Sequence, residues 1–125
     1  MIAVDTSSWV AYLSGSSGGD VEAVELALRQ SQACLPPVVL TELLSDPKLP
    51  RTAAALLLEL PLLDVTEGYW ERAGALRASV LSRARKARLA DTLIAQSCLD
   101  HDVPLISRDR DFQSFARASS LKLLT

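Results

Sequence analysis

Residues 88–112 constrain the fold more than any other stretch of this sequence, which reads RLADTLIAQSCLDHDVPLISRDRDF there. Asp91 precedes an apolar run rich in helix formers, which predicts a helix that begins at an acidic cap. Residues 103–106 are short and apolar and predict a strand that ends at Ser107, with Asp109 and Asp111 after it. In parallel α/β sheets, ligands and catalytic groups gather beyond the carboxyl ends of the strands. The segment therefore predicts a functional site at such an edge.

Short apolar segments alternate with helical patterns along the whole chain. Strands are predicted at residues 2–4, 33–35, 62–65, 103–106 and 121–124. Helices are predicted after Asp5, after Asp20 as a cap, after Pro36-Pro37, over residues 51–60, from Glu67 to a basic end at residues 82–88, and from Asp91. This alternation is typical of a parallel sheet covered by helices on both faces. A length of 125 residues, 49% of them hydrophobic, suits a single domain over residues 1–125.

The composition excludes several classes of site. No apolar run approaches the roughly 20 residues of a membrane span, and the N-terminus lacks a secretory pattern, so we expect a cytoplasmic protein without a membrane partner. Cys34 and Cys98 lie in apolar surroundings without a CxxC motif, which indicates reduced, buried thiols rather than zinc ligands. The only histidine, His101, is flanked by acids at an expected helix end and is interpreted as a solvated residue.

Charge is distributed unevenly along the chain, whose net charge is −2. Residues 1–70 contain three Lys or Arg and nine Asp or Glu, whereas residues 71–125 contain ten and six. The densest basic stretch includes Arg83, Arg85, Lys86 and Arg88. Two explanations remain open for these cations: stabilisation near a helix C-terminus by the helix dipole, or contact with the phosphates of RNA.

Four acids stand at related places in the predicted fold: Asp5 after the first strand, Glu42 within a helix, Asp91 at a helix start and Asp109 after the fourth strand. Each alone could be a cap, a turn residue or a solvated side chain. Together they predict a cluster that must be protonated, paired with arginine or bound to a cation. Carboxylate oxygens favour Mg²⁺ or Mn²⁺. Thr6, Ser7 and Ser107 have no nearby histidine, so an acyl-transfer triad is not expected.

Four motifs carry a resemblance to a known family: VDTSSW around Asp5, VVLTELLSD around Glu42, LADTLIAQ around Asp91 and LISRDRDF around Asp109. The chain resembles the PIN-domain ribonucleases, and most closely their VapC-type toxins, over essentially its whole length. The last two motifs are the most specific. Ser107 replaces the threonine of many members, which retains the hydroxyl. The segment KARLAD replaces a stretch that often contains glycine.

The resemblance implies a PIN-like three-layer α/β/α fold with a central parallel sheet of four to five strands. It implies metal-dependent cleavage of RNA, with catalytic acids at Asp5, Glu42, Asp91 and Asp109. Of these, Asp5, Asp91 and Asp109 are expected to bind Mg²⁺ (or Mn²⁺). Additional site residues are expected among Asp111, Thr6 and Ser107, and RNA contacts at Arg83, Arg85, Lys86 and Arg88. The resemblance further implies a VapB-type antitoxin as partner and a homodimer.

Apolar residues near the N-terminus are the expected antitoxin surface. Trp9, Tyr12 and Leu13, with residues 52–60, offer more apolar area than a small chain is expected to bury by itself. Two other functions remain open. A phospho-accepting receiver-like domain would need an acid beside Asp5 and a lysine at the end of the last strand, where Lys122 lies within the strand instead. A non-catalytic binding module with the PIN fold would not need all four acids.

Overall fold

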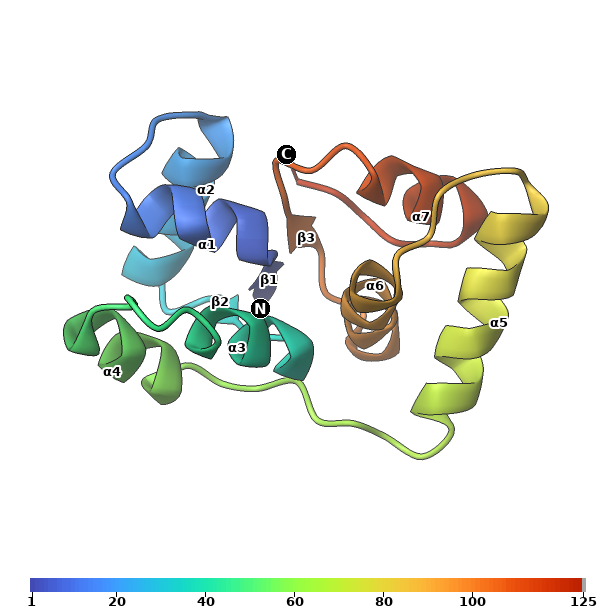
Figure 1. The fold of residues 1–125 in the computed structure, drawn as a ribbon, viewed down its shortest axis with the longest axis horizontal. Helices are drawn as coiled ribbons and strands as arrows, with labels where there is room; N and C mark the ends of the chain where they lie inside the picture. The colour runs from blue at the N-terminus through green and yellow to red at the C-terminus, as the bar shows by residue number, and fades with distance from the viewer. Residues whose placement is uncertain (125) are drawn as a thin grey trace.

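The computed structural model describes residues 1–124. Its strands and helices follow one another as β1 (Ile2–Val4), α1 (Thr6–Leu13), α2 (Gly19–Arg29), β2 (Ala33–Cys34), α3 (Pro37–Leu44), α4 (Arg51–Glu59), α5 (Tyr69–Ser82), α6 (Leu89–His101), β3 (Leu105–Ile106) and α7 (Phe112–Ala118). Figure 1 shows the strands in the middle of the molecule, with α1 to α4 on one side and α5 to α7 on the other. The predicted parallel α/β organisation is confirmed, but within residues 1–124 the sheet has three strands rather than the expected four to five.

The sheet is parallel and has the order β2-β1-β3. Ile2 pairs with Ala33, and Ala3 with Leu105. Single parallel bridges, Leu35 with Leu62 and Leu105 with Leu123, extend the sheet at its two edges. The strands predicted at residues 62–65 and 121–124 are therefore reduced to one bridge each, and the strand predicted at residues 103–106 to its last two residues.

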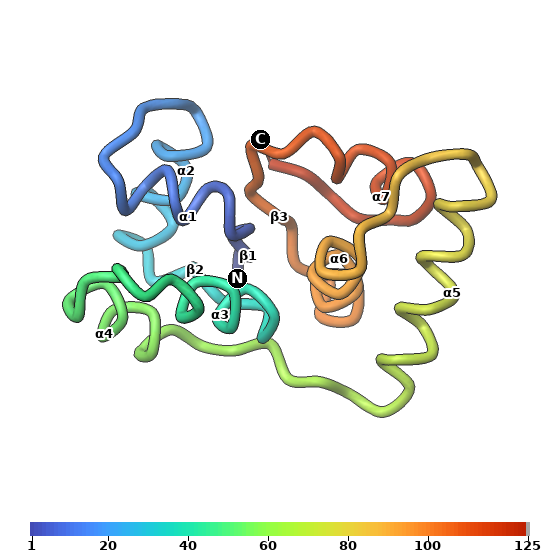
Figure 2. Tube along the Cα trace, viewed as in Figure 1, coloured from blue at the N-terminus to red at the C-terminus, as the bar shows by residue number. Residues whose placement is uncertain are grey.

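Helix boundaries differ from the expected ones where the backbone leaves the helical conformation. Gly68 has a φ of 83°, so α5 starts at Tyr69 rather than at Glu67. Ala84 has a φ of 56°, and α5 ends at Ser82, before most of the basic stretch. Residues 83–88 consequently form a connection between α5 and α6. Figure 2 shows this connection running back from the end of α5 to the start of α6, beside α7.

Two of the three acids expected as helix caps lie inside the first turn of their helix instead. Arg88 is the N-cap of α6, so Asp91 is the third residue of that helix. Gly18 is the N-cap of α2, so Asp20 is its second residue. Asp5, by contrast, is the N-cap of α1, and its side chain accepts a hydrogen bond from the Ser7 amide. The prediction of a cap is therefore confirmed only for Asp5.

The hydrophobic core joins the sheet to the helices around it. It includes Val4, Leu35, Ile94 and Phe112. Trp9 belongs to this core with an exposed fraction of 0%, so the expectation that it contributes to an exposed partner surface is wrong. Cys34 and Cys98 are free and buried, as predicted. Among residues 1–124, no helix is both long and apolar enough to cross a membrane.

Candidate active site

Three carboxylates meet at the carboxyl end of the sheet. Asp91 comes from the first turn of α6, and Asp109 and Asp111 come from the loop between β3 and α7. One oxygen of each lies within 4.8 Å of the corresponding oxygens of the other two. The predicted meeting of Asp91 and Asp109 is thus observed, and Asp111 lies with them.

Asp91 is the least satisfied member of this group. Its Oδ2 is buried and has no hydrogen-bond partner among residues 1–124. Burial raises the pKa of its carboxyl to about 6, with further contributions from the negative charges of Asp5, Asp109 and Asp111. Arg88 opposes this rise in pKa. A buried acceptor without a partner destabilises the folded protein unless something outside the chain supplies one.

Asp5 follows β1 and has an exposed fraction of 4%. Its Oδ2 accepts hydrogen bonds from the Ser7 hydroxyl at 2.6 Å and the Ser107 hydroxyl at 2.9 Å. Burial raises the pKa of the Asp5 carboxyl even though these hydroxyls oppose the shift. The Ser107 Oγ also accepts the amide proton of Asp109 at 3.0 Å. Ser107 therefore links Asp5 to the loop that carries the other acids.

Glu42 lies at the edge of the site. It is exposed on α3, and its Oε1 accepts a hydrogen bond from the Thr6 hydroxyl at 2.7 Å. Since Thr6 directly follows Asp5, this bond attaches Glu42 to the start of α1. Glu42 does not belong to the group of carboxylates whose oxygens lie within 4.8 Å of one another. The structure therefore places Glu42 beside the acidic cluster rather than within it.

Residues 83–88, which we call the basic connection, adjoin two of these acids. Lys86 Nζ is 3.4 Å from Asp111 Oδ2, and the charge of Arg88 acts on Asp91. Arg83 Nη1 donates to the backbone oxygen of Arg117 at 3.1 Å. Arg85 is exposed. Because only Arg83 adjoins the end of α5, the helix-dipole explanation does not account for the other three cations.

A second carboxylate site was missed by the sequence analysis. Asp20, exposed by 6%, is held by Arg108 through Nε at 2.8 Å and Nη2 at 3.0 Å, and by the Ser8 hydroxyl at 2.9 Å. The Arg108 hydrogen bond lowers the pKa of Asp20 to about 2. Gly18 permits this approach, because a Cβ there would lie 2.7 Å from Asp20 Oδ1. No pattern in the sequence predicts that Asp20 and Arg108 form a pair. The only available signal is that Arg108 lies between Ser107 and Asp109, two residues of the predicted site.

The donor set of the cluster suits a divalent cation. Carboxylate oxygens from separate elements converge, and the buried Asp91 Oδ2 has no partner among the described residues. Mg²⁺ and Mn²⁺ favour such hard oxygen ligands. The receiver-like alternative fits less well, because the hydroxyls of Ser7 and Ser107 surround Asp5 where that alternative needs an adjacent acid.

Comparisons with known proteins agree with this geometry. Residues 2–118 match the PIN-domain family model. The chain is 32% identical to VapC ribonuclease Mb1587 of Mycobacterium bovis, over 98% of this chain and 96% of the relative. Ribonuclease VapC11 of Mycobacterium tuberculosis gives the same values.

Solved structures share the fold. VapBC2 from Rickettsia felis, bound to a DNA fragment from its promoter, aligns with a TM-score of 0.78 at 19% identity, covering 98% of this chain and 97% of that chain. FitAcB from Neisseria gonorrhoeae aligns with a TM-score of 0.71 at 19% identity, covering 100% and 97%.

Proposed function

The chain belongs to the PIN-domain family, and we propose that it is a metal-dependent endoribonuclease of the VapC type that acts as the toxin of a toxin–antitoxin pair. The observation that carries this proposal is the convergence of Asp91, Asp109 and Asp111, with a buried oxygen of Asp91 left unpaired among the described residues. Carboxylates this close repel one another unless they are protonated or bound to a cation, so the arrangement favours a metal-dependent function.

The roles of the acids follow from their surroundings. Asp91 and Asp109 are proposed ligands of Mg²⁺ (or Mn²⁺), together with Asp5, whose negative charge reaches Asp91. Asp111 is a further candidate ligand because it shares the cluster. A bound Mg²⁺ supplies an activated water and stabilises charge on the phosphate that is attacked. Ser107 orients Asp5 and the Asp109 amide, while Thr6 orients Glu42 at the edge of the site.

The decisive experiment compares the wild type with Asp91→Asn in RNA cleavage. We expect cleavage to require Mg²⁺ or Mn²⁺, to stop in excess chelator and to fall by roughly a thousandfold in the variant, the loss expected for about 4 kcal/mol of transition-state stabilisation. Asp64→Asn is the matched control, because Asp64 is exposed and its contact with His101 uses the backbone oxygen. Undiminished cleavage by Asp91→Asn would remove the basis of the proposal.

Metal binding gives a second readout that does not depend on activity. Mn²⁺ at a hundred times its Kd should stabilise the wild type by about 2.7 kcal/mol. Asp64→Asn should gain as much, and Asp91→Asn should gain far less. Equal thermal shifts in all three proteins would show that Mn²⁺ does not bind at Asp91.

The basic connection is the proposed approach for RNA. Lys86 and Arg88 adjoin Asp111 and Asp91, and Arg83 and Arg85 extend the positive charge from there. Phosphates that follow the cut position along the strand would meet these cations. Such contacts position a nucleic acid without reading its sequence.

We also propose a VapB-type antitoxin partner and a homodimer. With Trp9 buried, the candidate apolar surface is a hollow of about 260 Å³ lined by Val10, Leu13 and Glu42, among others, with Val10 exposed by 54%. Leu58 of α4 is exposed by 63%. An antitoxin segment in this hollow would lie beside Thr6 and close to the acids. Co-purification with the product of the adjacent reading frame, and loss of cleavage on its addition, would support this pairing; unaffected cleavage by a monomer would contradict it.

A further inference from the structure

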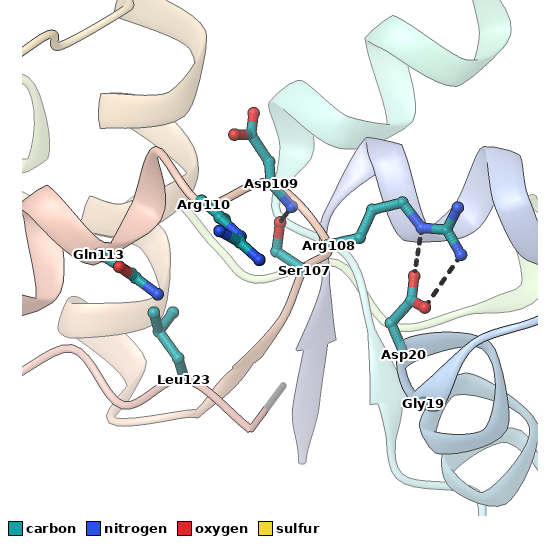
Figure 3. A pocket seen from close by; sticks show the side chains of 8 residues that line it. All are labelled: Gly19, Asp20, Ser107, Arg108, Asp109, Arg110, Gln113 and Leu123. Carbon is teal, nitrogen blue, oxygen red and sulfur yellow. Dashed lines mark hydrogen bonds and ion pairs between the residues drawn. The ribbon is translucent and has the colours of Figure 1, made fainter.

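A second hollow adjoins the acidic cluster at Asp109, and none of the residues 83–88 lines it. It has a volume of about 400 Å³, and Asp109, Arg110, Gln113, Arg108, Asp20 and Leu123 contribute to its walls. Figure 3 shows the Arg108–Asp20 pair on one side, Arg110, Gln113 and Leu123 on the other, and the Asp109 carboxylate pointing away from them at the rim. The hollow therefore begins where the acidic cluster ends.

The two arginines of this hollow differ in how their guanidinium groups are used. Arg108 donates to Asp20 and to the backbone oxygen of Ser17, so its plane is held in place. Within residues 1–124, by contrast, the exposed Arg110 guanidinium forms no ion pair. Its cation is therefore available to an anionic ligand. Arginine binds phosphate with two parallel hydrogen bonds, which adds orientation to attraction.

The remaining walls suit a nucleoside. The Gln113 side chain is exposed and carries both a donor and an acceptor, which can pair with the edge of a base. Leu123 offers an apolar surface, and the fixed plane of Arg108 can stack on a base, as arginine does with unpaired bases of RNA. The volume lies within the range of small-molecule sites.

We propose that this hollow is a nucleotide subsite, in which Arg110 binds a phosphate and Gln113 contacts the base next to the cut. An RNA strand whose scissile phosphate lies at the acids must continue in both directions. On one side it meets the basic connection at Lys86 and Arg88. On the other it meets Arg110. The assignment to RNA rests on the proposed function, whereas binding of a nucleotide in the hollow does not.

Nucleotide binding is tested first without metal, so that no bound ion attracts the phosphate. Nucleoside 5′-monophosphates are titrated into isotope-labelled protein and followed by NMR. The side-chain amide of Gln113 and the backbone amide of Leu123 should shift in the wild type and in Arg117→Ala, which removes an exposed arginine of α7 that does not line the hollow. Arg110→Ala should abolish these shifts, and Arg110→Lys should retain part of them. Identical shifts in Arg110→Ala, or none in the wild type, would overturn the proposal.

Cleavage kinetics separate the two contacts. Arg110→Ala should raise KM roughly tenfold for every RNA sequence with a smaller change in kcat, since it removes the charge-assisted contact with phosphate. Gln113→Ala should change the base preferred beside the cut, and Arg117→Ala should change neither quantity. If the wild type cuts RNA but both variants keep its KM and base preference, the subsite is refuted while the nuclease stands.

Two other outcomes are equally informative. A wild type that cuts no RNA would refute the proposed function, and the NMR titration would still decide whether the hollow binds nucleotides. Shifts at Gln113 and Leu123 that the antitoxin produces and nucleotides do not would assign the hollow to a protein partner and overturn the proposal.

Discussion

Asp5 and Asp20 have similarly small exposed fractions, 4% and 6%, but Asp5 lies deeper in the protein, and their pKa values move in opposite directions. Asp20 has a guanidinium partner, and hydrogen bonding from Arg108 lowers its pKa to about 2. Asp5 accepts hydrogen bonds from hydroxyls and a backbone amide but has no cationic partner, so burial prevails and raises its pKa. Asp91, near Asp5, has a pKa raised to about 6. The buried Asp20 thus belongs to a stable ion pair, whereas the carboxylates of Asp5 and Asp91 carry negative charge that no ion pair balances.

The difference separates a structural carboxylate from a functional one. Arg108 and Asp20 connect the loop after β3 to α2, and Ser8 extends this connection to α1. Because Arg108 lies between Ser107 and Asp109 in the chain, the ion pair holds the backbone from which site residues project. The acids of the cluster have only the exposed Lys86, beside Asp111, and the charge of Arg88, acting on Asp91, as positive partners among residues 1–124. The Arg108–Asp20 ion pair therefore holds in place a cluster of carboxylates that repel one another and would be stabilised by a bound cation.

The largest expected effect comes from breaking the ion pair. Arg108→Ala leaves the buried Asp20 carboxylate without its cationic partner and should destabilise the fold. The loss should be smaller than for a fully buried pair, because the Arg108 side chain is 40% exposed and already partly solvated. Differential scanning calorimetry at pH 7 should show a melting temperature lower by roughly 10 °C.

The pH dependence identifies the cause. The folded pKa of Asp20, about 2, lies below its ordinary value of 3.8, so the pair stabilises the fold above pH 3.8 and loses this effect as pH falls toward 2. The difference between wild type and Arg108→Ala should shrink over that range. The double variant Asp20→Asn with Arg108→Ala should recover much of the loss, since Asn still accepts from Ser8. A double variant no more stable than Arg108→Ala would contradict an effect of unpaired charge.

A smaller effect of opposite sign is expected at Asp91. Its folded pKa of about 6 lies above the ordinary 3.8, so its protonation stabilises the fold fully below pH 3.8, and this contribution is lost as pH rises through 6. In metal-free protein at pH 7, Asp91→Asn should therefore be more stable than wild type by about 2 kcal/mol. At pH 3.5 the two proteins should unfold at nearly the same denaturant concentration.

The matched control for this effect is Asp64→Asn. Asp64 is exposed, and its substitution should leave stability unchanged at both pH values. Denaturant midpoints measured across pH 3.5 to 7.5 would decide the matter. Equal stability of wild type and Asp91→Asn at pH 7 would mean that the Asp91 charge is not destabilising, and that Asp91 behaves as an ordinary first-turn residue of α6.

Local sequence patterns predicted the strands and helices around the two regions better than they predicted the contacts between distant residues. The buried strand Ile2–Val4 was predicted at its observed bounds, because a short apolar run before a capping Asp is a local signal. The clustering of Asp91 with Asp109 followed from the topology of a parallel sheet. The outer strands shortened to single bridges because edge pairing depends on neighbours distant in sequence.

The ion pair of Asp20 with Arg108 could not be predicted in this way. Asp20 after a glycine-rich loop has the same local appearance as a helix cap, and its partner lies 88 residues later. Nor does the sequence distinguish Asp111 from a turn residue, although it lies in the cluster. Tertiary packing determines whether a buried carboxylate lies beside a cationic side chain. It does so for Asp20 and not for the acidic cluster.

The smallest effect on stability is expected at Lys86, whose ion pair with Asp111 is the exposed counterpart of the Arg108 pair. The two side chains are 55% and 36% exposed and 3.4 Å apart, so Lys86→Ala should change stability by about 0.5 kcal/mol or less. Its effect should appear in RNA binding instead. If Lys86 contacts a phosphate, the slope of log affinity against log salt should fall by about 0.7. Lys48→Ala, which removes an exposed lysine from the connection before α4, should leave the slope unchanged. An unchanged slope in Lys86→Ala would mean that this lysine serves only to moderate the charge of Asp111, and RNA would then have to approach the acids from another side.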